Sequence, residues 1–173
     1  MNFGVTLKLA LEKLKDLVIT EFKKIIIKQR EQSGKLTHWC RIKQNFSTEK
    51  YLNYITTAAV QRTAVTKLRL SDHKLPIEVG RFCNPKIPRR DRICNLCPQI
   101  TLGDEFHLIC ECSHPKLVKF RDLLFSKISG ISNSFESLDI KNKFVYLLSC
   151  VDKDVTKLFC QFCFKMLNVG EKG

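Results

Sequence analysis

Four residues near the middle of the chain constrain the fold more than any other feature. Cys94, Cys97, His107 and Cys112 follow the spacing C-x2-C-x9-H-x4-C. Three thiolates and one imidazole are the donors of a tetrahedral zinc site, and four protein ligands leave no open position for catalysis. Structural zinc contributes about 10 kcal/mol or more to the folding of small modules. We therefore expect one structural Zn2+ ion to organise this polar segment as a zinc knuckle.

The identity of the fourth ligand has an alternative. Cys110 also lies within reach of His107, but the four-residue spacer before Cys112 leaves room for a helical turn and favours Cys112. Glu105 is a candidate acceptor for the second imidazole nitrogen. Neighbouring cations should favour the deprotonated thiols that bind zinc. These cations are Arg89, Arg90 and Arg92.

The chain contains a second C-x2-C pair, Cys160 and Cys163, within the apolar run from Leu158 to Phe164. No histidine or further cysteine follows this pair. Since reduced cysteine often behaves as a small buried hydrophobe, we predict that both residues belong to the core.

The remaining sequence predicts helices. Apolar residues recur at spacings of three and four, with charged residues between them, which is typical of amphipathic helices. The predicted helices cover residues 5–31, 58–70, 116–128, 135–150 and 155–167. Three prolines and a glycine exclude a continuous helix through residues 71–93. We predict an all-α fold with an inserted zinc knuckle, organised as segments 1–57, 58–128 and 129–173.

The chain is strongly basic, with 30 Lys and Arg against 17 Asp and Glu and a net charge of +13. Such an excess favours an anionic partner, most simply nucleic acid. The excess is concentrated just before the zinc motif, where nine cations face three acids. The candidate nucleic-acid-binding residues are Arg62, Lys67, Arg69, Lys74, Arg81, Lys86, Arg89, Arg90 and Arg92.

The composition also suggests where the protein resides. Its hydrophobic share of 44% is ordinary for a globular protein. No run of about 18 apolar residues occurs, and charged residues interrupt the N-terminal segment, so neither a membrane span nor a secretory signal is expected. Nine cysteines without an export signal indicate reduced thiols. We expect a nuclear or cytoplasmic protein that is not secreted and does not bind a membrane.

Two runs of the sequence resemble a known family. The first is K-L-R-x-S-x-H-x-L, residues 67–75, followed by I-E-x-G-R at residues 77–81; the second is the zinc motif itself. They are the most specific parts of a similarity, over about residues 33 to 125, to the region that follows the polymerase in jockey-like non-LTR retrotransposon proteins. The resemblance implies that the four predicted ligands are the family's zinc-knuckle ligands. In that family the knuckle is associated with nucleic-acid binding.

The chain departs from the full-length family pattern in one respect. It contains no Tyr-x-Asp-Asp stretch and no endonuclease-like cluster of acids and histidines. The resemblance therefore implies a truncated or fragmentary copy of a reverse transcriptase, an RNA-directed DNA polymerase, without its catalytic domains. We expect no enzyme activity from this chain.

The leading hypothesis is a non-catalytic accessory segment that binds the phosphate backbone of RNA or DNA with little sequence preference. The polymerase domain of a full-length element is a further expected partner. Phe82 and Phe106 are candidates for base stacking, and each is equally a candidate for the core. The alternative is a zinc-stapled helical scaffold that binds protein. Its apolar C-terminal helices would supply the contact surface.

Overall fold

The computed structural model describes residues 3–33, 42, 48–54 and 57–169. It divides the chain into two compact units, Met1–Ser47 and Thr48–Gly173. The first domain boundary therefore lies after residue 47, whereas the sequence predicted it after residue 57. The segments predicted as 58–128 and 129–173 belong to one unit because helices from both of them pack together.

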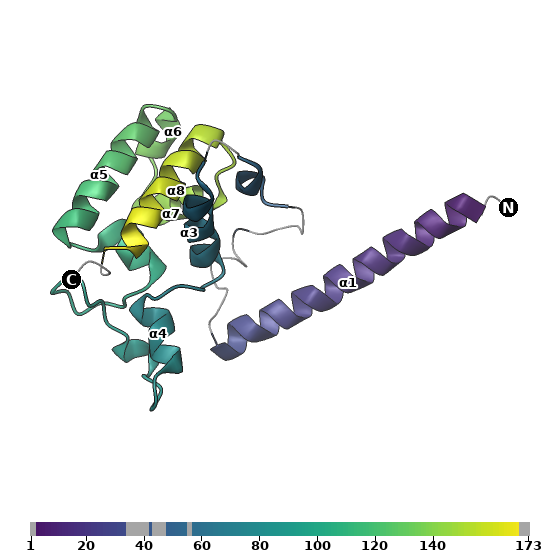
Figure 1. The fold of residues 1–173 in the computed structure, drawn as a ribbon, viewed down its shortest axis with the longest axis horizontal. Coiled ribbons are helices and arrows are strands. Elements are labelled where there is room, and N and C mark those ends of the chain that lie inside the picture. The colour runs from purple at the N-terminus through teal and green to yellow at the C-terminus, as the bar shows by residue number, and fades with distance from the viewer. Residues whose placement is uncertain (1–2, 34–41, 43–47, 55–56, 170–173) are drawn as a thin grey trace. The chain divides into compact units, whose positions relative to one another are not determined.

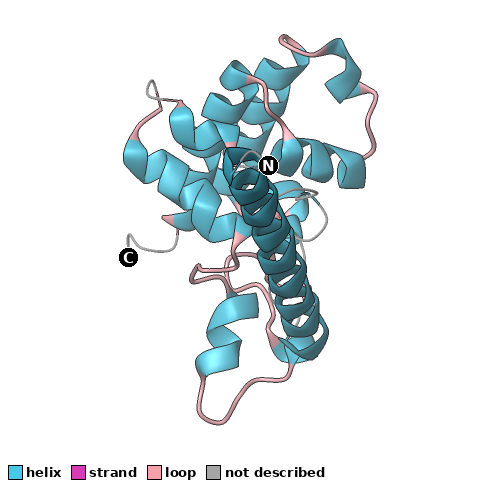
Figure 2. Ribbon diagram, turned by 90° about the vertical axis from the view of Figure 1, so that its right-hand side faces the viewer, coloured by secondary structure: helices cyan, strands magenta, loops and turns pink. Residues whose placement is uncertain are grey.

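The described elements confirm the predicted all-α class. Figure 2 shows helices joined by loops, and one isolated antiparallel bridge links Ile93 to Leu102. The elements (Figure 1) are α1 (Phe3–Ser33), η1 (Lys50–Asn53), α3 (Ala59–Arg69), α4 (Pro76–Phe82), η2 (Arg89–Asp91), η3 (His107–Glu111), α5 (Pro115–Ser129), α6 (Asn133–Glu136), α7 (Ile140–Ser149) and α8 (Lys153–Leu167).

In the first unit, α1 is one uninterrupted helix of 31 residues that ends at Ser33 (Figure 1). It extends two residues beyond each end of the predicted helix. Ile26 is buried, whereas most of the large apolar side chains of α1 are exposed.

In the second unit, α8 lies at the centre of the core. It contacts α3, α5 and α7, and Figure 1 shows it between α3 and α5. Cys160 and Cys163 are fully buried in α8, as predicted. Burial raises the pKa of Cys160 to about 11 and that of Cys163 well above its usual value, so both remain protonated thiols.

Two aspartates determine where the C-terminal helices begin. The Asp139 carboxylate accepts a hydrogen bond from the Asn142 backbone N–H, and Asp152 accepts from the backbone N–H groups of Asp154 and Val155. Each aspartate is therefore a helix N-cap. The cap at Asp139 divides the predicted helix 135–150 into α6 and α7.

The proline-rich segment contains two short helical elements that the sequence did not predict, α4 and the 3-10 helix η2. Pro76 occupies the first turn of α4, where its missing N–H leaves no hydrogen bond unmade. The segment is thus interrupted, as expected, but seven of its residues form an α-helix.

None of the described helices is both long and apolar enough to cross a membrane.

Candidate metal centre

The first two cysteines lie on a loop that a short antiparallel pairing closes. The Cys94 backbone N–H donates to the carbonyl of Thr101 at 2.9 Å, and the Gly103 N–H donates to the carbonyl of Arg92 at 2.9 Å. These bonds flank the bridge between Ile93 and Leu102. The chain therefore reverses between the two bonded segments, and Cys97 lies on this reversal.

The other two residues come from a single wide helical turn. Asp104 caps its start, because its carboxylate accepts from the His107 backbone N–H at 2.9 Å. The Cys112 N–H then donates to the carbonyl of His107 at 2.7 Å, a five-residue separation that makes η3 a π-helix. This turn brings His107 and Cys112 to the same side. The spacer before Cys112 is therefore helical, as the sequence suggested.

The four predicted side chains meet. One ligand atom from each of Cys94, Cys97, His107 and Cys112 lies within 4.8 Å of all the others. Cys94 Sγ is 3.9 Å from Cys112 Sγ, and Cys97 Sγ is 3.4 Å from His107 Nε2. One metal ion could therefore contact all four residues.

The structure separates the two candidates for the fourth ligand. The Cys110 thiol donates to the carbonyl of Ile140 at 3.9 Å, within the helical core. Burial raises the pKa of Cys110 to about 12. Cys112 instead faces the cluster, and its carbonyl accepts a hydrogen bond from Arg121 of α5 at 3.2 Å. The structure thus favours Cys112.

The thiols of the cluster differ in acidity. Burial raises the pKa of Cys97, but hydrogen bonds from the Gln99 backbone and from His107 outweigh this effect and lower the pKa to about 6. Burial raises the pKa of Cys112 to about 12. A metal ion would therefore find one thiolate already formed and would displace a proton from Cys112.

The arginines that were expected to lower these pKa values are engaged elsewhere or exposed. Arg92 donates to the carbonyls of Ile77 and Ile87 at 2.8 and 3.0 Å. Arg90 lies 3.7 Å from Asp91 at the surface. Hydrogen bonding to Gln99 and His107, and not these guanidinium groups, is the main cause of the low Cys97 pKa.

Two side chains that the sequence did not suggest lie near the second nitrogen of His107, Nδ1. The Thr101 hydroxyl lies 3.2 Å from Nδ1, and Glu111 Oε2 lies 3.7 Å from it. Glu105, the expected acceptor, instead binds His73 Nε2 at 2.8 Å. The expectation for Glu105 is therefore wrong. Glu105 lies two positions before His107 in the helical turn, so the two side chains lie on different faces.

Glu105 anchors the turn after α3 to the metal loop. His73 Nδ1 accepts from the Leu75 backbone N–H, so Nε2 carries the proton and donates to Glu105. The Ser71 hydroxyl donates to the same carboxylate at 3.4 Å. Because both nitrogens of His73 are engaged, His73 is not placed to accept a proton from Ser71, and the three residues do not form a catalytic triad.

Helix α4 packs directly on the metal loop. The Ile77 N–H donates to the carbonyl of Gly103, and a Cβ atom at Gly103 would lie only 2.7 Å from Pro76. A Cβ atom at Gly80 would lie 2.7 Å from the side chain of Arg92. The two glycines therefore permit close contact between α4 and the metal loop.

Four of the nine predicted nucleic-acid-binding residues are held by the fold. Arg69 is 5% exposed; it pairs with Glu49 at 2.8 Å and donates to the Leu148 carbonyl. Arg62 donates to the carbonyls of Tyr54 and Thr57, Arg81 pairs with Glu78, and Arg92 binds carbonyls as described above. These four residues therefore do not belong to the candidate binding surface, because their guanidinium groups bind internal partners.

Three other predicted cations are exposed, and they follow an exposed aromatic residue along the chain. Phe82, at the end of α4, is 78% exposed. Lys86, Arg89 and Arg90 follow on a loop that folds back, since the Ile87 N–H donates to the carbonyl of Gly80 and η2 contacts α4. We call Phe82, Lys86, Arg89 and Arg90 the cationic tip. The other stacking candidate, Phe106, packs edge-on against Phe144 with ring centroids 5.3 Å apart.

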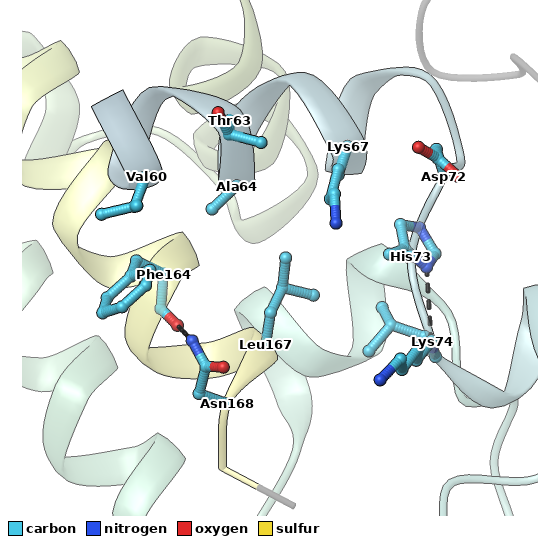
Figure 3. A pocket seen from close by; sticks show the side chains of 11 residues that line it. Val60, Thr63, Ala64, Lys67, Asp72, His73, Lys74, Phe164, Leu167 and Asn168 are labelled. Atoms are coloured by element: carbon cyan, nitrogen blue, oxygen red, sulfur yellow. Dashed lines mark hydrogen bonds between the residues drawn. The ribbon is translucent and has the colours of Figure 1, made fainter. Parts of the chain in front are cut away.

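The last two predicted cations, Lys67 and Lys74, line a hollow of about 520 Å3 between α3 and the end of α8. Figure 3 shows Val60 and Ala64 of α3 facing Phe164 and Leu167 of α8 across it. At the other end of the hollow, away from Val60 and Phe164, lies the imidazole of His73, which is hydrogen-bonded to Glu105. The hollow thus has apolar walls and a partly charged rim.

The second unit is therefore a helical domain with a Cys3His cluster that could hold a metal ion. No protein-family model matches the chain, and neither a curated protein nor a solved structure is significantly similar to it.

Proposed function

We propose that the metal is zinc and that its role is structural. Bonds of about 2.3 Å to sulfur and about 2.05 Å to nitrogen place two sulfurs about 3.8 Å apart, and a sulfur and a nitrogen about 3.5 Å apart, in a tetrahedral site. In the structure, the Cys94 and Cys112 sulfurs lie 3.9 Å apart, and Cys97 Sγ lies 3.4 Å from His107 Nε2. The donor set and these two distances fit zinc, and all four ligand atoms lie within 4.8 Å of one another.

The position of the ligands explains what the ion would stabilise. Cys94 and Cys97 belong to a loop, whereas η3 contacts α5 and α7 of the core. An ion bound by all four residues would fasten the loop to the core. Because α4 is packed on this loop through Gly103, the ion would also fix α4 and the cationic tip beyond it.

We propose further that the protein binds nucleic acid through the cationic tip, as a non-catalytic accessory segment. The observation that carries this proposal is the 78% exposure of Phe82 at the end of α4, together with three exposed cations on the following loop, which packs against α4. Base stacking on an aromatic side chain contributes about 1–3 kcal/mol per base, and cations neutralise the neighbouring phosphates. Both contacts tolerate any sequence, so weak sequence preference follows.

The resemblance to the post-polymerase region of retrotransposon proteins supports this proposal independently. It supplies the expectation of a zinc knuckle that acts beside a polymerase domain. Arg69, His73 and Arg81 lie within the runs that carry the resemblance, and they have internal partners. Lys86, Arg89 and Arg90 lie between these runs and are exposed.

Fluorescence anisotropy with single-stranded RNA and DNA oligomers tests the proposal. For the zinc-loaded protein, log affinity should fall linearly with log salt, with a slope of about −0.7 for each phosphate contact. Replacing Lys86, Arg89 and Arg90 with alanine should reduce the magnitude of this slope by about 2. Phe82→Ala should weaken binding about fivefold to 150-fold and leave the slope unchanged.

A matched control removes the same charge elsewhere. Lys119, Lys141 and Lys153 are exposed on α5, α7 and α8, and their replacement by alanine should alter the slope much less. Equal effects of the two triple variants would reject the cationic tip and indicate binding by net charge alone. No binding at low salt would reject the nucleic-acid function.

A second function is favoured by the hollow between α3 and α8. The C-terminal helices were expected to supply a protein-binding surface, but their aromatic residues Phe144, Phe159 and Phe162 are buried in the core. Phe164, in contrast, lines the hollow. This hollow could accept an apolar side chain of a protein partner. Ala64→Trp would fill it, and loss of a protein partner without loss of nucleic-acid binding would support the second function.

A further inference from the structure

Helix α1 carries a row of large apolar side chains that are about half exposed. The exposed fraction of each member lies between 47% and 61%. The row consists of Leu7, Leu11, Leu14, Val18, Phe22 and Ile25. Exposed apolar surface of this extent on one face of a helix usually marks an interaction site.

The spacing of the row fits the seam of a coiled coil. Successive members are four, three, four, four and three residues apart. At about 100° per residue, this alternation keeps all six on one side of the helix. Rows with this alternation form the interface between paired helices.

The length of α1 restricts what could cover the row. A helix of 31 residues is about 46 Å long, at about 1.5 Å per residue. The longest described helices of the second unit, α5 and α8, have 15 residues and are about 22 Å long. The row itself spans about 27 Å from Leu7 to Ile25, and α5 and α8 are already packed against each other in the core of the second unit. Another copy of α1 is longer than the row and carries the same pattern.

We propose that α1 pairs with α1 of a second copy of this chain and forms a homodimer. Six side chains exposed to this degree would bury roughly 1,000 Å2 in total across the two helices, near the lower end for a specific interface. The interface lies in the first unit and does not depend on the metal centre or on nucleic-acid binding. Dimerisation would place two metal-supported units in one assembly.

The test measures the mass of the full-length, zinc-loaded protein by sedimentation equilibrium between about 1 and 100 µM. The chain mass is 20.1 kDa, and a dimer has twice that value. The disrupting variant combines Leu11→Lys with Leu14→Lys, which places charges in the row. Lysine is a good helix former, so helicity measured by circular dichroism in excess trifluoroethanol should be retained.

A matched control uses the opposite face of the same helix. Leu9 and Ile27 are 54% and 47% exposed and lie about half a turn away from the row. The Leu9→Lys, Ile27→Lys variant introduces the same charge and removes comparable apolar surface. We expect its dimer dissociation constant to change less than about threefold, and that of Leu11→Lys, Leu14→Lys to rise at least about 100-fold.

Three outcomes would overturn the proposal. The first is a wild-type protein that remains a monomer at 100 µM, because a second copy then does not cover the row. The second is a dimer that persists in Leu11→Lys, Leu14→Lys. The third is equal dissociation of both double variants, because association then does not use one face of α1.

Discussion

Replacement of Gly103 by alanine should weaken metal binding through a steric clash alone. The new Cβ atom would lie 2.7 Å from Pro76 Cγ, 2.9 Å from Pro76 Cβ and 3.0 Å from Cys94 Cα. The neighbours cannot easily recede, because the Gly103 N–H donates to Arg92 and its carbonyl accepts from Ile77. The clash therefore acts on a ligand residue and on the helix packed against it.

The expected magnitude follows from this crowding. Overpacking a well-packed site costs about 1–3 kcal/mol. The metal loop must adopt this crowded arrangement to bind the ion, so the cost of overpacking should lower the metal affinity. At about 1.4 kcal/mol for each factor of ten, zinc should bind roughly 5- to 150-fold more weakly to Gly103→Ala.

Competition with a chromophoric chelator at pH 7.5 measures this affinity, and thermal unfolding of the zinc-loaded protein measures stability. Gly130→Ala is the control, because its Cβ atom would lie 3.5 Å from the nearest atom, an ordinary contact. The backbone at Gly130 is already helical, so this change should be neutral or stabilise by up to about 1 kcal/mol. Wild-type affinity and stability in Gly103→Ala, or equal losses in both variants, would refute the reasoning.

Three further predictions concern the ligands and one buried arginine. Cys112→Ser should abolish the tetrahedral cobalt(II) absorption spectrum, whereas Cys110→Ser should retain it, because only Cys112 faces the cluster. Below pH 9, zinc affinity should fall at least about tenfold for each pH unit, because Cys112, whose pKa is about 12, must release a proton to bind the ion. Below pH 6 the fall should be steeper, because Cys97 is then also protonated. Calorimetric titration in matched buffers measures this dependence, and an affinity that does not change with pH would contradict the prediction. Arg69→Met should lower the free energy of unfolding by about 2 kcal/mol, measured by urea denaturation, and a change under 0.5 kcal/mol would contradict the internal role of this residue.

The metal cluster and most helices could be predicted because their signals are local. The ligand spacing specifies a loop and a helical turn, and periodic apolar residues specify helices such as α3 and α8. The sequence could also have indicated the start of η3, since Asp104 lies three residues before His107 in the position of a capping residue. It gave no comparable signal for Thr101, whose contact with His107 depends on how the loop closes.

The roles of the basic residues could not be predicted from charge. Arg69 and Lys67 belong to the same helix, yet Arg69 is buried against Glu49 and Tyr51 while Lys67 is exposed. Part of the difference was present in the sequence, because Arg69 follows Val65 by four residues and so shares the buried face of α3. Its partners Glu49 and Leu148 lie in distant segments, and only the folded chain brings them together.

The two proposals can be separated because they depend on different parts of the chain. The cationic tip follows α4, and α4 is packed on the metal loop through Gly103, so removal of the metal should release the tip and abolish its nucleic-acid binding. The apolar row belongs to α1, in the other compact unit. Chelation should therefore eliminate RNA binding while the dimer persists. Joint loss of both properties on chelation would mean that the metal supports the whole chain, and the division of roles between the two units would have to be abandoned.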